Sequence, residues 1–261
     1  MRPHPRTRSN AAGLGLALLG LAALAGCTGS APPATAKATQ AAQSATAMLD
    51  ESVGALLSAG TVHFSLNEHT QGESSTSSGD LTPTSGRAVI TYNKTEHETF
   101  MFIGGAAYVR ADEQALESVF GVPAVQARLF WGEWIVVKSG EKLGTRTYAE
   151  LVQGMTLSAM ASQLLLCGPC TLTAPVTAAG QREVGVRMPV TTTGQGKVAA
   201  SAREVLYVTD SPQPRPVLLE LQGDSDYAWN MSFSGFREAV RLTAPKDVTP
   251  ALMVTPNNTV T

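Results

Sequence analysis

The segment Tyr227-Ala-Trp-Asn-Met-Ser-Phe-Ser234 alternates large apolar side chains with small or polar ones. Because successive side chains of a β-strand point to opposite faces, this pattern predicts a strand with one apolar and one polar face. The apolar members are Tyr227, Trp229, Met231 and Phe233. A strand of this kind is typical of an antiparallel sheet that packs one face against a core and exposes the other to water.

Similar runs precede this segment along the chain. Strands are predicted at 62–67, 86–93, 98–103, 106–110, 134–138, 182–192, 200–209 and 216–222. Gly104-Gly105 separates two of them and fits a two-residue primed turn. The run Thr99-Phe-Met-Phe-Ile103 does not alternate, so both of its faces should be covered. The Ser/Thr/Gly-rich stretch 72–79 is expected to be a loop.

Apolar residues at three- and four-residue spacing predict helices at 48–57, 112–120 and 148–166. The elements therefore occur as strands, then helices, then strands again. This order predicts an α+β fold in which a large, curved, antiparallel sheet has helices packed on its concave side. The predicted domain spans 47–243.

The N-terminal residues 1–26 have the layout of an export signal. Arg2, Arg6 and Arg8 precede an apolar run at 11–24, which is too short to span a bilayer comfortably. The run ends in Leu24-Ala-Gly-Cys27, which resembles a bacterial lipobox, where the cysteine is diacylated and becomes the new N-terminus. An ordinary secretory signal with an incidental Cys27 is the alternative. Two acyl chains would anchor the mature protein stably to a membrane.

Residues 28–46 contain no large apolar side chain, so 27–46 is expected to be a flexible tether. The tail 244–261 is expected to be loose as well. The whole chain has 19 Lys+Arg and 21 Asp+Glu. Removal of the three signal arginines leaves 16 basic against 21 acidic residues, a net charge of −5. An acidic domain is repelled by nucleic acid, which excludes that class of partner.

Cys167-Gly-Pro-Cys170 has the spelling of a thioredoxin redox site. In such a site the motif follows a parallel strand and opens a helix that stabilises the thiolate. Here the preceding residues read as the end of a helix and the following ones as extended chain. Outside the cytoplasm the two thiols are expected to be oxidised, so a structural disulfide is favoured over a redox site or a metal site.

The sequence offers few other features of a catalytic site, and we predict a protein that is not an enzyme and has no cofactor or metal. It contains no nucleophile elbow, His-Glu-x-x-His motif or phosphate loop. Ser139 and Lys142 have Ser-x-x-Lys spacing but lie in a polar, Gly-flanked turn. His63 and His69 lie about 20 Å apart on one predicted strand, too far to share an ion, and His97 is read with them as a polar-face histidine.

Several short phrases together resemble the LppX/LprA/LprF/LprG family of actinobacterial lipoproteins. They are the lipobox, Ser52-Val-Gly-Ala-Leu-Leu-Ser-Ala-Gly-Thr-Val-His-Phe64, Ser78-Gly-Asp-Leu81, Ala106-Ala-Tyr-Val109, Trp131-Gly-Glu-Trp-Ile135 and Thr243-Ala-Pro-Lys-Asp-Val248. The resemblance implies a half-barrel sheet like that of the LolA/LolB carriers. It also implies an apolar cavity, between sheet and helices, that takes up a lipid or glycolipid. Cys167 and Cys170 depart from the family pattern.

This resemblance makes a membrane-anchored extracytoplasmic lipoprotein that carries an amphiphile the main functional hypothesis. The side chains expected to line its cavity are Met155, Met160, Leu164, Phe100, Phe102, Tyr227, Trp229, Met231 and Phe233. They could equally fill a solid core. In that case the protein would be an interaction lipoprotein that docks a membrane-protein partner through loops such as 68–80. A thiol-disulfide oxidoreductase acting through Cys167 and Cys170 is the third hypothesis.

Overall fold

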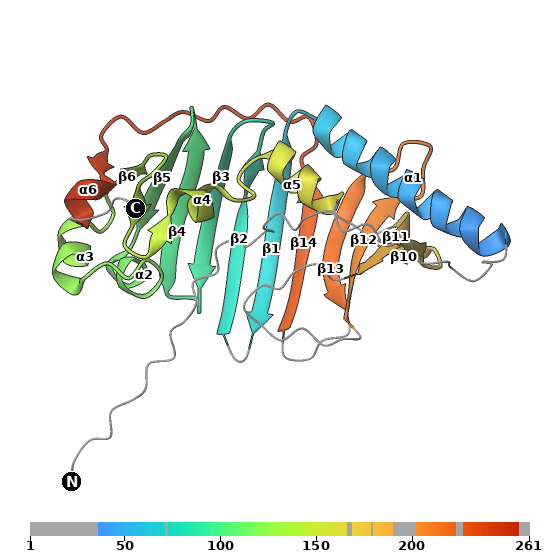
Figure 1. Ribbon diagram of the computed structural model, residues 1–261, viewed down its shortest axis with the longest axis horizontal. Coiled ribbons are helices and arrows are strands. Elements are labelled where there is room, and N and C mark those ends of the chain that lie inside the picture. Colours follow the sequence, from blue (N-terminus) through green and yellow to red (C-terminus); the bar gives the residue numbers. More distant parts are fainter. Residues whose placement is uncertain are drawn as a thin grey trace, which may run out of the picture.

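The structure is a computed structural model that describes residues 36–70, 73–165, 169–178, 180–189, 202–222 and 227–255. A sheet of thirteen strands forms the body of this part of the chain. Helices lie across one of its faces (Figure 1). The helices on this face are α1 (Ala36–Ser58), α4 (Tyr148–Val152) and α5 (Leu157–Leu164). The sheet is curved and not closed, which confirms the predicted α+β half-barrel.

Most strands that are neighbours in the sheet are also neighbours in the sequence. The long ones are β1 (Val62–Thr70), β2 (Glu73–Leu81), β3 (Gly86–Tyr92), β4 (Glu96–Ile103), β5 (Ala106–Ala111), β11 (Gln181–Pro189), β12 (Arg203–Thr209), β13 (Pro216–Gln222) and β14 (Tyr227–Ser234). The short ones are β6 (Ile135–Val137), β7 (Lys142–Leu143), β8 (Arg146–Thr147), β9 (Thr171–Leu172), β10 (Val176–Ala178) and β15 (Thr249–Pro250). The sheet runs β10-β11-β12-β13-β14-β1-β2-β3-β4-β5-β6-β15, with β9 beside β11 and β7-β8 as a separate hairpin.

The strand β14 pairs with β1 at the middle of the sheet, although the two are far apart in sequence. Phe233 lies opposite Phe64, and Met231 lies opposite Leu66. Met231 and Phe233 are buried, Trp229 is half-buried, and the intervening Asn230 and Ser232 are exposed. The alternation in 227–234 therefore predicts the inward face of β14 correctly. The pairing of β14 with β1 joins the N-terminal and C-terminal strands of the fold into one sheet.

The turn between β4 and β5 also has the predicted form. Gly104 and Gly105 both have positive φ, +60° and +79°. This is the conformation of a type I′ turn, which β-branched or bulky residues rarely adopt. In the strand that precedes the turn, the successive residues Phe100 and Met101 are each only 9 % exposed. Both faces of β4 are therefore covered, as the absence of alternation in 99–103 predicted.

The Ser/Thr/Gly-rich stretch 72–79 was expected to be a loop, and this prediction was wrong. Residues 73–79 belong to β2, which pairs along its length with β1 and β3. Ser75 and Ser77 are buried on the core side of this strand, and a Cβ at Gly79 would collide with the Arg87 carbonyl oxygen. Close packing between the strands thus requires small residues at these inward positions of β2. This requirement outweighs the low strand propensity of serine and glycine.

Both ends of the predicted domain were also placed too far inward. Residues 36–46 of the expected tether are the first half of α1, because alanine, lysine and glutamine form helices readily. The tail expected at 244–261 contains β15, which pairs with β6 in parallel, and the helix α6 (Ala251–Val254). Ala251 and Val254 are fully buried in the core. The fold therefore extends from Ala36 to Val254 rather than over 47–243.

The helices α2 (Glu113–Ser118) and α3 (Ala124–Phe130) follow β5 at one end of the sheet. Asp112 caps α2, because its Oδ1 accepts a hydrogen bond from the Ala115 amide at 2.7 Å. Thr147 and Glu150 form a capping box at the start of α4. No helix among the described residues is both long and apolar enough to cross a membrane.

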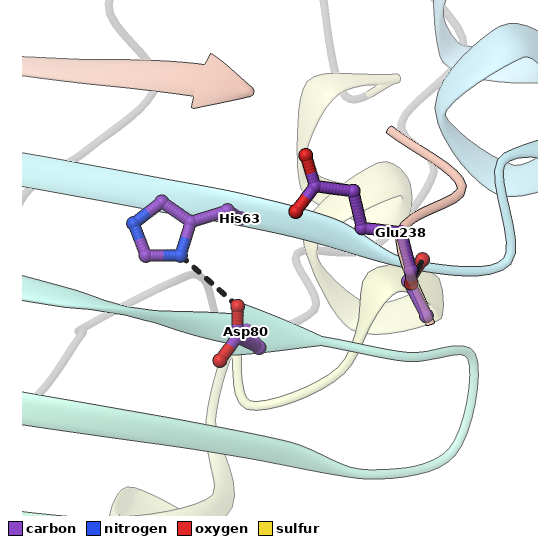
Figure 2. A network of polar contacts seen from close by, with 4 residues as sticks. His63, Asp80 and Glu238 are labelled. Atoms are coloured by element: carbon purple, nitrogen blue, oxygen red, sulfur yellow. Dashed lines mark hydrogen bonds and ion pairs between the residues drawn. The ribbon is translucent and has the colours of Figure 1, made fainter. Parts of the chain in front are cut away.

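A polar network on the opposite face of the sheet holds the segment that follows β14. His63 Nδ1 of β1 lies 3.0 Å from Asp80 Oδ1 of β2, and Glu238 lies nearby (Figure 2). The Glu238 carbonyl accepts a hydrogen bond from the Thr61 hydroxyl, and the Arg237 amide donates to the Thr61 carbonyl at 3.1 Å. These bonds link the chain after β14 to the start of β1.

Candidate functional site

A small pocket lies between β3 and β4 of the sheet and the segments that cover them. Its volume is about 30 Å³. Its lining residues are Ile90, Tyr92, Glu98, Phe100, Val119, Phe120, Arg146, Glu150, Leu151, Gln153 and Met155. A water molecule needs roughly 10 to 15 Å³ of such volume, so the pocket has room for about two.

The walls of this pocket are largely apolar. The rings of Phe100 and Phe120 have centroids 6.0 Å apart and are tilted by 38°. Leu151 and Met155 cover them from α4 and from the link between α4 and α5, and both are buried. Aromatic rings at this distance and tilt pack favourably, so this wall is a firm part of the core.

Two polar side chains interrupt the apolar wall. Glu98 of β4 is only 2 % exposed, and its Oε1 accepts a hydrogen bond from the Tyr92 hydroxyl at 2.6 Å. The other carboxyl oxygen, Oε2, is buried without a hydrogen-bond partner, and so is Nη2 of Arg146. No Arg146 nitrogen lies within 4.0 Å of a carboxylate oxygen among the described residues. The pocket lining thus includes two buried polar atoms, Glu98 Oε2 and Arg146 Nη2, that do not form a hydrogen bond with each other.

Burial determines the protonation of the acid in this pocket. Desolvation raises the pKa of Glu98 to about 8, while the Tyr92 hydrogen bond and the Arg146 charge act in the opposite direction. Burial, followed by the neighbouring Glu98, also raises the pKa of Tyr92 well above its usual value. Glu98 is therefore mostly protonated at neutral pH, and an uncharged carboxyl can donate a hydrogen bond.

A second buried carboxyl lies further along the same face of the sheet. Glu68 of β1 is 8 % exposed, and its Oε1 has no hydrogen-bond partner. Burial raises the pKa of Glu68, while a hydrogen bond with Tyr227 lowers it. Burial and the nearby Glu68 raise the pKa of Tyr227. The face that packs against the helices therefore carries two acids among apolar side chains.

The side chains expected to line a cavity all lie on or near this face, but in different surroundings. Phe100 and Met155 line the pocket. Met160, Leu164, Met231 and Phe233 are buried in the core, and Phe102 and Trp229 pack against it half-buried. Tyr227 lies beside Glu68. The structure thus gathers them into one apolar face, and a common cavity for all nine stays a prediction.

Glu68, Glu98 and Arg146 were not among the site residues predicted from the sequence. A signal for the two acids was present in the strand pattern. Glu68 has the same parity as Val62, Phe64 and Leu66, and Glu98 has the same parity as Phe100 and Phe102. A charged residue at an inward-facing position is unusual in a core and can be recognised from alternation alone. Arg146 gave no such signal, because it lies on a two-residue strand.

The cysteine motif lies where a helix ends and a strand begins, as predicted. The helix α5 ends at Leu164 and β9 begins at Thr171, so the motif does not open a helix. Cys170 is buried. Cys167 and the lipidation candidate Cys27 lie outside the described residues, so the disulfide and the anchor stay predictions.

The histidines are distributed over the polar face of the sheet. His63 contacts Asp80, His97 Nδ1 lies 3.1 Å from the Thr91 hydroxyl, and His69 is exposed. Among the described residues no three His, Cys, Asp or Glu side chains are placed to hold a metal ion. His63 and His97 therefore make separate local contacts on that face.

Comparisons with known proteins place the fold. No protein-family model and no curated protein matches the sequence. Among solved structures, LprF from Mycobacterium bovis is similar with a TM-score of 0.51 at 14 % identity, over 78 % of this chain and 98 % of LprF. The Mycobacterium tuberculosis lipoprotein LppX is similar with a TM-score of 0.50 at 12 % identity, over 77 % of this chain and 99 % of LppX. The chain has the fold of these mycobacterial lipoproteins, as the resemblance implied.

Proposed function

We propose that the protein is an extracytoplasmic lipoprotein, anchored to the cell membrane through Cys27, that binds one amphiphile between its sheet and its helices. The observation that carries this proposal is the apolar face of the half-barrel beneath α4 and α5, with a pocket already open in it. The same fold in the lipoproteins LprF and LppX is consistent with it. The proposal assigns no catalytic role to any residue.

Binding an alkyl chain requires the pocket to enlarge. Pockets for small ligands typically measure about 300 to 1,000 Å³, which is at least ten times the 30 Å³ of this pocket. The cover is made of short helices, α4 with five residues and α5 with eight. Hydrogen bonds of its Tyr148, Leu157 and Ser158 to the carbonyls of Gly105, Thr82 and Pro83 hold the cover to the sheet. Helices this short have little stability of their own, so displacement of the cover is the expected route of entry.

The anchor is tested by substitution of Cys27. We expect the wild-type protein, produced in a bacterium that processes lipoproteins, to fractionate with the membrane and to carry the mass of a diacylated N-terminal cysteine. Cys27→Ser should abolish this modification, because the acyl chains are attached to the cysteine sulfur. Membrane fractionation and intact-protein mass spectrometry measure both. A soluble, unmodified wild-type protein cleaved at another position would contradict the anchor.

Uptake of an amphiphile is tested with the acyl-free chain 27–261 carrying Cys27→Ser, which retains every described element. After incubation with dioleoyl-phosphatidylcholine vesicles containing hexadecanoate and removal of the vesicles, we expect native mass spectrometry to detect one bound amphiphile per chain. Carbonic anhydrase, passed through the same steps, controls for non-specific carry-over. A chain that takes up no amphiphile from such vesicles would contradict the proposal.

A second candidate function is favoured by an exposed apolar surface on α3 and α6. Val125, Leu129 and Trp131 are 70, 66 and 59 % exposed, and Met253 of α6 is 66 % exposed. The two helices lie together at one end of the molecule (Figure 1). Exposed apolar groups that cluster in this way are typical of interaction sites. With a filled core the protein would dock a membrane-protein partner, through this surface rather than through 68–80, most of which is strand.

A further inference from the structure

We propose that the pocket between Glu98 and Arg146 binds the acyl head of a single-chain amphiphile, with its carboxylate or ester carbonyl oxygen between Glu98 Oε2 and Arg146 Nη2. This inference rests on the proposed function and adds to it the chemistry of the ligand. It follows from the unused polar atoms, the charges and the size of the pocket.

The first argument is the pair of unsatisfied polar atoms. Glu98 Oε2 and Arg146 Nη2 are both buried, both lack a hydrogen-bond partner, and both belong to residues that line the pocket. A buried polar group without a partner costs about 1 to 3 kcal/mol, and more if it is charged. Native proteins rarely leave such groups unpaired without a reason. A ligand oxygen placed between them would satisfy both at once.

The second argument is the direction of the hydrogen bonds. Tyr92 already donates to Oε1 of Glu98, so the proton of the neutral acid is left on Oε2. The guanidinium of Arg146 can only donate. Two donors therefore belong to residues that line the same small pocket, which favours a ligand oxygen that accepts, as in a carboxylate or a carbonyl. The raised pKa of Glu98 supports this assignment, because it keeps the acid protonated at neutral pH.

The third argument is the charge around the pocket. Arg146 is the cationic residue of the lining, so a positively charged head would be repelled. The Glu150 carboxylate accepts hydrogen bonds from the amide and hydroxyl of Thr147 at 2.7 and 2.9 Å and is committed to the helix cap. Nearby, Asp112 caps α2, and Glu96 accepts from Gln114 and Ser118. Glu150 keeps its negative charge, but its Oε2 is held at the helix cap, whereas Arg146 has a buried nitrogen without a partner. The charged atom left for a ligand oxygen is therefore a cationic donor, which favours a neutral or anionic head.

The fourth argument is size. A volume of 30 Å³ holds two or three non-hydrogen atoms, which matches a carboxyl group and excludes a sugar. Phe100, Phe120 and Met155 are next to the polar atoms and can contact the first methylenes of the chain. The pocket thus provides a polar end and the beginning of an apolar path.

Binding of hexadecanoate to the acyl-free chain 27–261 tests this inference. We expect hexadecanoate and its methyl ester to displace the apolar dye 1-N-phenylnaphthylamine, and hexadecyltrimethylammonium to do so far more weakly. Arg146→Met should weaken hexadecanoate binding roughly 10- to 100-fold, the loss of one charge-assisted hydrogen bond, and should weaken the ester less. Glu98→Leu should weaken both, whereas Glu98→Gln, which keeps a donor, should retain binding within a few-fold.

The matched control is Arg87→Met, which removes an exposed arginine from the opposite face of β3 and should leave hexadecanoate binding unchanged. If a variant at 146 fails to fold, as judged by circular dichroism, a titration of wild type with carboxyl-¹³C hexadecanoate gives the answer. A buried head should shift the carboxyl resonance and make it insensitive to bulk pH. An unshifted resonance, equal binding of the cation, or unchanged binding in a folded Arg146→Met would overturn the inference. In those cases continued dye binding would leave the proposed function intact, and loss of all dye binding in wild type would remove both.

Discussion

Replacement of Glu98 by glutamine should stabilise the protein at pH 8.5 by about 4 to 5 kcal/mol while leaving its stability at pH 4 almost unchanged. Glutamine has nearly the same shape as a protonated glutamic acid, and its carbonyl can accept the hydrogen bond that Tyr92 now donates to Oε1. It cannot ionise, however. The difference between the two proteins therefore isolates the free energy of ionising Glu98 inside the fold.

The sign follows from the two pKa values of this carboxyl. In the unfolded chain Glu98 titrates near 4.5, and in the folded protein near 8. Below pH 4.5 both states are protonated and Glu98 does not penalise folding. Between pH 4.5 and 8 the unfolded state releases the proton and the folded state retains it, so wild-type stability falls by about 1.4 kcal/mol per pH unit. The loss is complete above pH 8, at about 5 kcal/mol.

Urea denaturation at pH values from 4 to 9 measures this effect. Glu117→Gln, which neutralises an exposed acid of α2, is the control and should give a curve parallel to that of the wild type. Parallel curves for Glu98→Gln and wild type over the whole range would mean that Glu98 is not held protonated by burial. Its carboxyl could then not donate a hydrogen bond to a ligand at neutral pH, which contradicts the role proposed for it in the pocket.

Replacement of Phe120 by alanine should destabilise the protein by about 3 to 5 kcal/mol and enlarge the pocket. Phe120 is fully buried and packs against Phe100, and its backbone carbonyl accepts hydrogen bonds from the amide and the hydroxyl of Thr145. Truncation removes the ring but keeps these backbone contacts. The surrounding wall is only partly free to relax, so a cavity should remain.

Two measurements on the Phe120→Ala variant test this prediction, one of its stability and one of its dye binding. Urea denaturation should show the loss of stability, whereas Val125→Ala, at a residue that is 70 % exposed, should change it by less than about 0.5 kcal/mol. Fluorescence of 1-N-phenylnaphthylamine should show tighter dye binding than in wild type, because an apolar cavity accepts apolar ligands. A loss of stability below 1 kcal/mol, or weaker dye binding in the folded variant, would mean that Phe120 does not wall the pocket.

The alternation of apolar and polar residues made much of the sheet predictable. It predicted β14 and β1 and which of their side chains point toward the core. Gly104 and Gly105 predicted the turn between β4 and β5. The alternation did not predict β2, whose inward residues before Leu81 are two serines and a glycine. These small residues are needed because β3 packs closely against β2, and the composition of β2 alone does not show that contact.

The ends of the fold and the polar part of the site were less accessible to sequence reasoning. The first half of α1 has an alanine-rich composition that fits a tether as well as a helix. The burial of Val254 depends on β15 pairing with β6, which is more than a hundred residues away. The inward positions of Glu68 and Glu98 could be inferred from the alternation, but the presence of Arg146 in the same pocket as Glu98 depends on how the hairpin β7-β8 packs. Side chains that meet only through tertiary packing leave no local pattern.

The most direct test of the account is extraction of the acyl-free protein after it has been produced in a bacterium and purified without detergent. Chloroform–methanol extracts should contain close to one amphiphile per chain, measured by mass spectrometry against an internal standard. A head that is a carboxylate or an ester would fit the pocket. Extracts without any amphiphile, from a folded protein that also fails to take one up from vesicles, would contradict the account and leave the interaction surface on α3 and α6 as the better explanation.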